Sequence, residues 1–207
     1  MPPLSSLTLT ALLDRVAAPE PTPGGGSVAA VAGALGTALV QMVAGLPRTR
    51  RNDDDERAVL ASLAAPLADL RERLLGLADE DTAAFDRLMA AFRLPKASDD
   101  DKAARRAAIQ AATREATAVP LQTAVVAARA LDLAGTVAAL GNPSAASDLR
   151  VGVGMLAAAA EGAAANVRIN LETITDEAFR ADAAARIAAV LDEVTTHSQA
   201  VTAALQG

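Results

Sequence analysis

The sequence contains no cysteine, no tryptophan and no tyrosine, and His197 is its only histidine. The absence of cysteine excludes disulfides, thiol catalysis and cysteine-based zinc sites, and one histidine cannot form a histidine cluster around a metal. With only three phenylalanines as aromatic residues, the chain lacks the stacking platforms that bind single-stranded nucleic acid. The net charge of −6, spread over interspersed acidic residues, also disfavours a nucleic-acid partner. We therefore expect neither a metal nor a nucleic acid as a partner.

Alanine and other small apolar residues dominate what is present. Hydrophobic residues make up 52% of the 207 residues, which is enough for a sizeable core. Alanine is the strongest helix former, and no segment shows the apolar–polar alternation of a strand. We predict an all-α fold in which residues 1–207 form a single-domain bundle of long Ala-rich helices. Because Asp14 and Arg15 interrupt the apolar N-terminus, we expect no signal peptide and a cytoplasmic protein.

The stretch from Pro21 to Pro47, PTPGGGSVAAVAGALGTALVQMVAGLP, joins three glycines to a long apolar segment. We expect Ser27 to cap a helix, because its hydroxyl can accept a hydrogen bond from a first-turn N–H group. Free N–H groups and the helix dipole then favour a polar or anionic ligand at a bare loop made of Gly24, Gly25 and Gly26. We expect Gly25 to adopt a positive φ, so that Gly25→Val weakens ligand binding before folding fails.

Two other readings of this stretch stay open. Ser27 to Leu46 is about long enough to span a membrane. Alanine and glycine are weak membrane residues, however, and no second candidate span is evident, so we expect no membrane partner. Alternatively, the glycines only allow helices to cross closely. Gly33 and Gly36 lie one turn apart, and glycine costs about 1 kcal/mol against alanine inside a helix, which indicates a close helix neighbour there.

The rest of the chain reads as helices separated by turns. Pro66 should kink or divide the helical pattern that runs from about Asp53 to Phe92. A capping-box-like pair formed by Ser98 and Asp101 should begin the next helix, with an interruption near Pro120. The remaining predicted helices run from Leu7 to Val16, from Asn142 to about Thr173, and from a cap at Thr175 or Asp176 to about Leu205.

Asp81 is the strongest candidate for catalysis. It falls on an apolar helical stripe made of Leu70, Leu74, Leu77, Ala84, Phe85, Leu88 and Phe92. Burial raises the pKa of a carboxyl group, and a carboxyl that titrates nearer neutral pH can shuttle protons. The alternative is a buried aspartate that caps a helix or pairs with a neighbour for structural reasons.

A second set of polar groups lies on a later Ala/Gly-rich helix. Ser147 and Asp148 fall in its first turn, and Asn166 and Asn170 share one face because they are four residues apart. Two amides on a face of small residues can read a ring that carries both donors and acceptors, such as a pterin. Hydrogen bonding between helices is the alternative role for the two asparagines.

Several motifs occur together in a fixed order: PTPGGGSVAA at 21–30, DTAAF at 81–85, LPK at 94–96, GN at 141–142, SDL at 147–149 and NVRINL at 166–171. In this combination the chain resembles the cyclodeaminase/cyclohydrolase family, from about Leu4 to Asp176. That family includes the C-terminal domain of formiminotransferase-cyclodeaminase and stand-alone methenyltetrahydrofolate cyclohydrolases. Bulky aromatics that often accompany the DTAAF motif are missing here.

The resemblance implies an all-α homodimer that acts on the one-carbon unit joining N5 and N10 of a tetrahydrofolate derivative. Asp81 matches the family's proposed catalytic aspartate, and Gly24 to Ser27 match its glycine loop. We also carry over Lys96 and Asn142 as substrate-binding residues, with Lys96 or the cluster Arg48, Arg50 and Arg51 holding glutamyl carboxylates. Ser147, Asp148, Asn166 and Asn170 complete the predicted substrate-binding set.

Two reactions fit one site. Either water attacks 5,10-methenyltetrahydrofolate to give 10-formyltetrahydrofolate, or N10 attacks a formimino carbon and ammonia leaves. Because the sequence shows no formiminotransferase part, we expect one activity and favour the cyclohydrolase. A competing class is a helical assembly module without catalytic activity, which would bind no folate.

Overall fold

Nearly the whole chain is helical. The computed structural model describes residues 2–47 and 53–206, and in these residues it contains helices but no strand. The elements are η1 (Leu4–Ser6), α1 (Leu9–Ala17), α2 (Gly25–Gly45), α3 (Asp54–Ser62), α4 (Ala64–Phe92), α5 (Asp99–Leu140), η2 (Pro143–Ala145), α6 (Ala146–Leu171) and α7 (Glu177–Ala204). The predicted all-α fold is confirmed.

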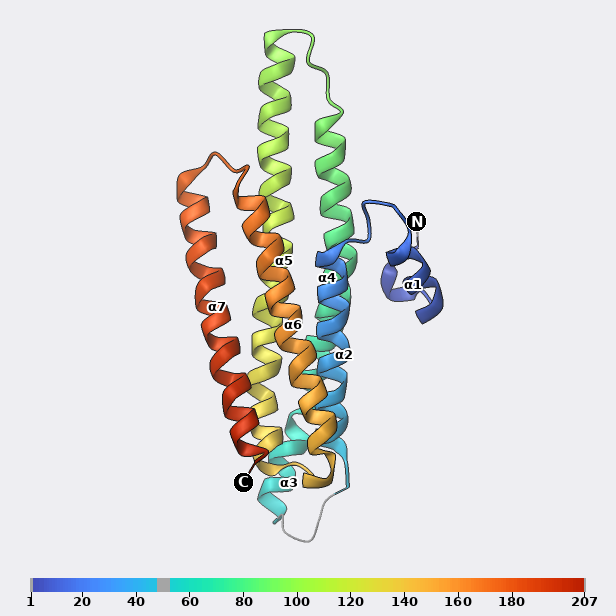
Figure 1. Cartoon of the computed structure of the whole chain (residues 1–207), viewed down its shortest axis with the longest axis vertical. Helices are drawn as coiled ribbons and strands as arrows, with labels where there is room; N and C mark the ends of the chain where they lie inside the picture. The colour runs from blue at the N-terminus through green and yellow to red at the C-terminus, as the bar shows by residue number, and fades with distance from the viewer. Residues whose placement is uncertain (1, 48–52, 207) are drawn as a thin grey trace.

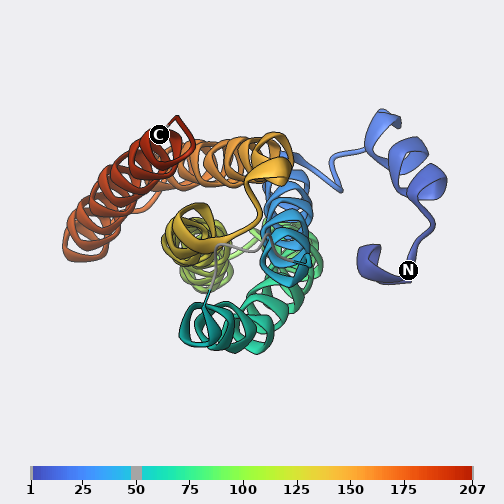
Figure 2. The same cartoon turned by 90° about the horizontal axis from the view of Figure 1, so that it is seen from below.

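Four long helices, α2, α4, α5 and α6, pack side by side, and α7 covers α5 and α6 from outside (Figures 1 and 2). The core between them consists of alanine, valine and leucine side chains, including the fully buried Leu67, Leu131 and Leu156. α4 and α5 extend past the other helices as a hairpin, and α1 stands apart from the bundle beside α2 (Figure 1). Small core residues therefore produce a narrow, elongated bundle.

Glycines let α2 and α6 approach closely. A Cβ atom on Gly36 would lie 2.7 Å from the carbonyl oxygen of Gly152 in α6, which is too close for any side chain. A Cβ on Gly33 would meet Leu74 of α4 at 3.1 Å. The predicted close helix neighbour is confirmed, and these two glycines position α2 against both α4 and α6.

Most predicted helix starts are confirmed by their caps. Asp53 accepts a hydrogen bond from the Glu56 N–H, and Asp176 accepts one from the Phe179 N–H. Ser98 and Asp101 form a reciprocal capping box. The predicted division near Pro66 lies at Leu63, so the proline occupies the first turn of α4, where no N–H is needed.

Two predictions about the helices are wrong. Pro120 does not interrupt α5, which continues through it from Asp99 to Leu140. Phe92 does not continue the buried stripe of α4, because it lies at the hairpin end with 45% of its side chain exposed and Arg105 over its ring. Leu74, Leu77 and Ala84 of that stripe are buried as predicted.

The expectation that only one segment could span a membrane is also wrong. By length and composition alone, α2 and a window within α5 would both qualify. Half of each window is buried inside the bundle, and the core helices of soluble proteins pass the same test. Their apolar character is therefore accounted for, at least in part, by packing within the chain.

Candidate functional site

The Asp81 carboxylate meets the first turn of α2. Its Oδ2 accepts a hydrogen bond from the Ser27 hydroxyl at 2.8 Å, and the carboxylate also accepts from the Ser27 backbone N–H. Asp81 therefore supplies from α4 the cap that α2 lacks in its own sequence, because the residue before the helix is Gly24 and has no side chain.

This geometry corrects the sequence prediction for the glycine motif. Ser27 is not the helix cap but the third residue of α2, and Gly25 and Gly26 belong to the first turn rather than to a bare loop. No glycine in the described ranges, residues 2–47 and 53–206, has a positive φ, so the expectation for Gly25 is wrong. Glycine is present here because of what approaches it, not because of its backbone conformation.

Gly26 is the glycine that the aspartate requires. A Cβ atom at this position would overlap the Asp81 carboxylate, and it would lie only 2.7 Å from its Cγ atom. A Cβ on Gly25, by contrast, would meet the side-chain nitrogen of Asn166 at an ordinary 3.6 Å. Two adjacent glycines of one motif therefore have different tolerances to substitution.

Burial dominates the electrostatics of Asp81. It raises the pKa of the carboxyl above its ordinary value of 3.8, and the two hydrogen bonds from Ser27 offset part of this effect because they favour the charged form. The acidic residues just before Asp81 have other partners. Asp79 accepts a hydrogen bond from Ser5, and Glu80 pairs with Arg73.

Sequence reasoning missed Thr82. Its hydroxyl lies 3.2 Å from the Ser27 hydroxyl, whose single hydrogen is donated to Asp81. Thr82 must therefore act as the donor toward Ser27, which extends the hydrogen-bonded chain from the buried carboxylate to a half-buried hydroxyl. The only sequence signal for this role is its position directly after Asp81.

Asn166 borders the same place from α6. Its side-chain nitrogen donates to the Gly162 carbonyl oxygen at 2.9 Å, and the side chain lies beside Gly25. Gly25, Gly26, Ser27, Asp81 and Asn166 are thus brought together from three helices. This group, together with Thr82, is called the Asp81 site below.

Asn170 has a structural role that the sequence does not reveal. Its side-chain nitrogen donates at 2.8 Å to the carbonyl oxygen of Ala116, four residues before Pro120. Proline has no N–H, so it leaves this carbonyl without its helical donor. The Asn170 amide replaces the missing donor, which helps to explain why α5 continues through Pro120.

This pairing predicts a coupled loss of stability. Asn170→Ala should destabilise the protein by about 1 kcal/mol, because a partly buried carbonyl loses its only replacement donor. In a Pro120→Ala background, where the backbone N–H is restored, the same substitution should cost much less. Thermal or urea unfolding of the four proteins measures the difference. Strictly additive effects would contradict this explanation.

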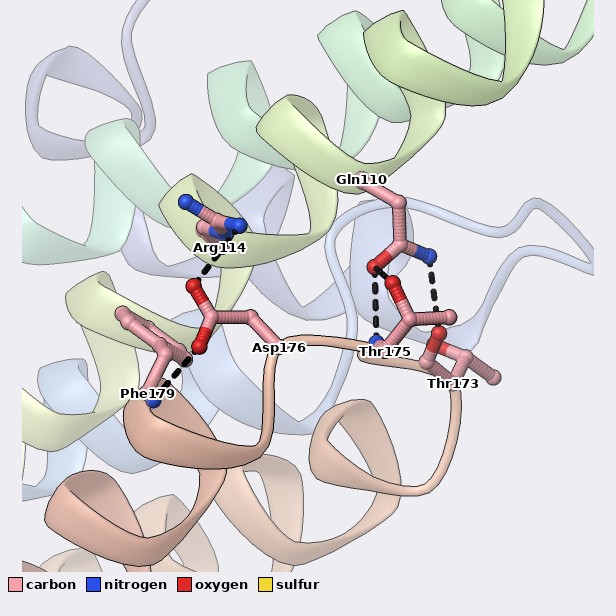
Figure 3. A network of polar contacts seen from close by, with 6 residues as sticks. All are labelled: Gln110, Arg114, Thr173, Thr175, Asp176 and Phe179. Carbon is pink, nitrogen blue, oxygen red and sulfur yellow. Dashed lines mark hydrogen bonds and ion pairs between the residues drawn. The ribbon is translucent and has the colours of Figure 1, made fainter.

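The end of α6 is held against α5 by a second network (Figure 3). Gln110 donates to the Thr173 carbonyl oxygen at 2.9 Å and accepts from the Thr175 N–H at 2.8 Å. Arg114 pairs with Asp176 at 3.0 Å, and Asp176 in turn caps α7. The turn that follows Asn166 and Asn170 is thereby fixed to the bundle.

The other predicted substrate-binding residues do not reach Asp81 within one chain. Lys96 is exposed in the turn after α4, roughly 16 Å along the helix axis from Asp81. Ser147 and Asp148 begin α6 at the far end of the bundle, roughly 28 Å from Asn166. Asn142 is nearby and donates to the Pro47 carbonyl oxygen.

Asn142 also lines a cavity of about 390 Å³ at that far end. The assignment of these four residues to substrate binding stays a prediction, because in one chain they cannot contact a one-carbon unit held at Asp81. The predicted arginine cluster Arg48, Arg50 and Arg51 lies outside the described residues.

The chain is similar to known proteins over most of its length. The family described as formiminotransferase-cyclodeaminase matches residues 8–189. A methenyltetrahydrofolate cyclohydrolase from Methylorubrum extorquens is 41% identical over 172 residues, which is 83% of each chain. A formimidoyltransferase-cyclodeaminase from Sus scrofa is 36% identical over 93% of this chain, which spans only 36% of that longer protein.

A solved structure extends the likeness to the fold. The crystal structure of formiminotetrahydrofolate cyclodeaminase from Thermotoga maritima superposes with a TM-score of 0.88 at 29% identity, covering 99% of this chain and 98% of that one. From the family match and these relatives we conclude that the chain belongs to the formiminotransferase-cyclodeaminase family.

Proposed function

We propose that this protein hydrolyses 5,10-methenyltetrahydrofolate to 10-formyltetrahydrofolate, with Asp81 as the acid–base group. The observation that carries the proposal is the partly buried carboxylate at the first turn of α2, whose pKa is raised by burial. The 41% identical relative of similar length, named as a cyclohydrolase, supports this reaction over the alternatives. No metal takes part in the proposed chemistry.

The proposed steps need only water and one carboxyl group. Water attacks the amidinium carbon of the cationic substrate, and Asp81 takes a proton from the water as the C–O bond forms. The tetrahedral adduct then collapses: the bond from carbon to N5 breaks, Asp81 returns its proton to N5, and the hydroxyl proton passes to solvent. One proton is released overall, and the ionised carboxylate also stabilises the cationic substrate.

The cyclodeaminase reaction is the second candidate, and two observations favour it. The structural relative from Thermotoga maritima carries that name. Burial also raises the pKa of Asp81, which favours the protonated form that an acid needs to protonate the leaving nitrogen when N10 displaces it from the formimino carbon. The cyclohydrolase remains the first choice because the similarity in sequence is greater.

Saturable binding of a non-reactive folate analogue tests whether the Asp81 site is a ligand site at all. Calorimetric titration should show one folate per site with wild-type protein, and Gly26→Val should weaken binding because its side chain displaces the carboxylate. A helical assembly module without catalytic activity would show no saturable binding with either protein.

We also propose that the protein acts as a homodimer through the face formed by α2 and α6. This α2–α6 face carries the exposed apolar residues Val28, Leu35, Met42, Val151 and Ile169. α2 contains no charged residue along its whole length. Val28, Leu35 and Met42 recur every seven residues and so share one side of α2, and exposed apolar surface of this kind typically marks an interaction site.

Sedimentation velocity at micromolar concentration provides the check. The wild-type protein should sediment as a dimer, and Leu35→Asp should shift it toward a monomer, because a charge would be buried without a partner. Glu161→Gln changes an exposed residue outside the apolar positions and is the control, which should sediment like wild type. A wild-type monomer at this concentration would contradict the proposal.

A further inference from the structure

α1 is only partly packed on its own chain: Leu12 lies against the core around Leu4, while other apolar residues of the helix stay exposed. Leu9, Leu13 and Val16 occupy one side of it and are 68%, 58% and 38% exposed, and none of its nine residues is buried. Both views show α1 standing apart from the bundle on the side of α2 (Figures 1 and 2). A nine-residue helix is unstable in isolation, so its apolar side needs a surface to pack on.

The chain on both sides of α1 is fixed close to Asp81. Before the helix, the Leu4 N–H and the Ser5 hydroxyl both donate to Asp79 of α4, and the Leu4 side chain is buried. After it, Pro23 is buried and α2 begins at Gly25. α1 is therefore not a free tail but a projection whose two attachment points flank the catalytic carboxylate.

We propose that α1 is an arm that packs on the α2–α6 face of a second copy and so brings that copy beside the first chain's Asp81 site. The inference rests on the homodimer proposed above. The α2–α6 face is apolar and lacks charged residues in α2, and the side of α1 formed by Leu9, Leu13 and Val16 has the same character.

The area of the α2–α6 face alone is at the low end of what a stable dimer buries. Two helices side by side, each about 10 Å wide and about 30 Å long, offer roughly 600 Å². A standard interface buries about 800 Å² per partner. An arm from each copy enlarges the contact, and because a two-fold interface is isologous, each copy both gives and receives one.

The arm would also explain how a ligand bound at the Asp81 site is enclosed. A pocket normally buries most of the surface of a small ligand. A cavity of about 590 Å³ lies between α4 and α5 and is lined by Leu70, Gln122 and Arg129 among others, none of which belongs to the Asp81 site. The surface that encloses a folate at Asp81 would then come from the second copy, held there by the arm.

Cross-linking tests where the arm packs, and it needs no substrate. Because the chain contains no cysteine, Leu13→Cys can be labelled at a single position with a benzophenone maleimide. A mixture of ¹⁴N- and ¹⁵N-labelled protein distinguishes links between copies from links within one chain. We expect mixed-isotope links from position 13 to α2 or α6, and few from the control Asp14→Cys, which lies on the polar side of α1 away from Leu9, Leu13 and Val16. Links confined to one chain, or none above the control, would overturn the proposal.

A matched pair of variants tests the consequence for the site. Leu9→Gln with Leu13→Gln should raise the dissociation constant of the dimer at least about 10-fold and lower turnover, with turnover recovering at high protein concentration. Asp14→Gln, on the polar side of α1, should change neither. If wild-type protein turns over no folate but the mixed-isotope links form, the proposed function fails and the arm stands. If the dissociation constant of the dimer is unchanged in both variants, the proposed arm is refuted and the proposed function is not.

Discussion

Asp81→Asn should lower turnover of methenyltetrahydrofolate by about 10²–10⁴-fold, which is the usual contribution of general acid–base catalysis. The substitution keeps the shape of the side chain but removes both the charge and the exchangeable proton. Since the amide oxygen of asparagine can still accept hydrogen bonds from Ser27, the contact between α4 and α2 is preserved.

The melting temperature separates catalysis from structure in the same preparation. Burial disfavours the ionised form of Asp81, so replacing it with a neutral amide should leave the melting temperature unchanged or raise it at neutral pH. If the aspartate served only as a helix cap, the variant would melt at a lower temperature while its folded fraction kept full specific activity. That outcome would mean that the catalytic residue has been assigned wrongly.

The pH dependence of stability gives an independent readout of the same residue. Because the pKa of Asp81 is raised in the folded protein, the folded state holds this proton more tightly than the unfolded state does. The resulting stability is fully present below the unfolded value of about 3.8 and is lost as pH rises through the folded pKa. When the free energy of unfolding is measured across this range, the contribution of Asp81 should decline with rising pH in wild type and be absent from Asp81→Asn.

Gly26→Ala should reduce turnover by about 10²-fold, because the added methyl group occupies the place of the Asp81 carboxylate. Displacing a reacting group by about 1 Å can cost that much. Gly25→Ala is the matched control, since its methyl group meets only Asn166 at an ordinary distance and the two substitutions have the same helix propensity. Equal turnover in the two variants would contradict the close fit between Gly26 and Asp81.

The sequence predicted the bundle better than the details that complete it. The predicted caps at Ser98 and Asp176 depend on residues three positions apart, and both are confirmed. Pro120 was misjudged because the group that offsets its missing N–H, Asn170, lies 50 residues further along the chain. No local rule connects a proline to a donor on another helix.

The Asp81 site shows the same limit. The apolar stripe correctly indicated a buried Asp81 with a raised pKa, since helical periodicity is a local property. The partner of Asp81 could not be predicted, because a cap is usually supplied by the residue before its own helix. Here Gly24 has no side chain and α4 supplies the cap, so Ser27 was given the wrong role.

The substrate-binding residues predicted at the ends of the bundle were assigned from motifs, and a motif carries no information on the distance to Asp81. These residues are Lys96, Asn142, Ser147 and Asp148. Ser147 and Asn166 occur in the same helix but lie toward opposite ends of α6, roughly 28 Å apart. A single sequence likewise does not distinguish a site within one chain from one completed by a second copy. Mixed-isotope cross-links from α1 would show that the site is completed by a second copy.

The most direct test of the proposed function is a parallel incubation of wild-type protein with 5,10-methenyltetrahydrofolate and with 5-formiminotetrahydrofolate. Products and free ammonia are measured against uncatalysed conversion in the same buffer. We predict that 10-formyltetrahydrofolate forms from the methenyl substrate well above the uncatalysed rate, and faster than ammonia is released from the formimino substrate. Ammonia release as the dominant reaction would assign the chain to the cyclodeaminase instead, and conversion of neither substrate above the uncatalysed rate would contradict a folate enzyme.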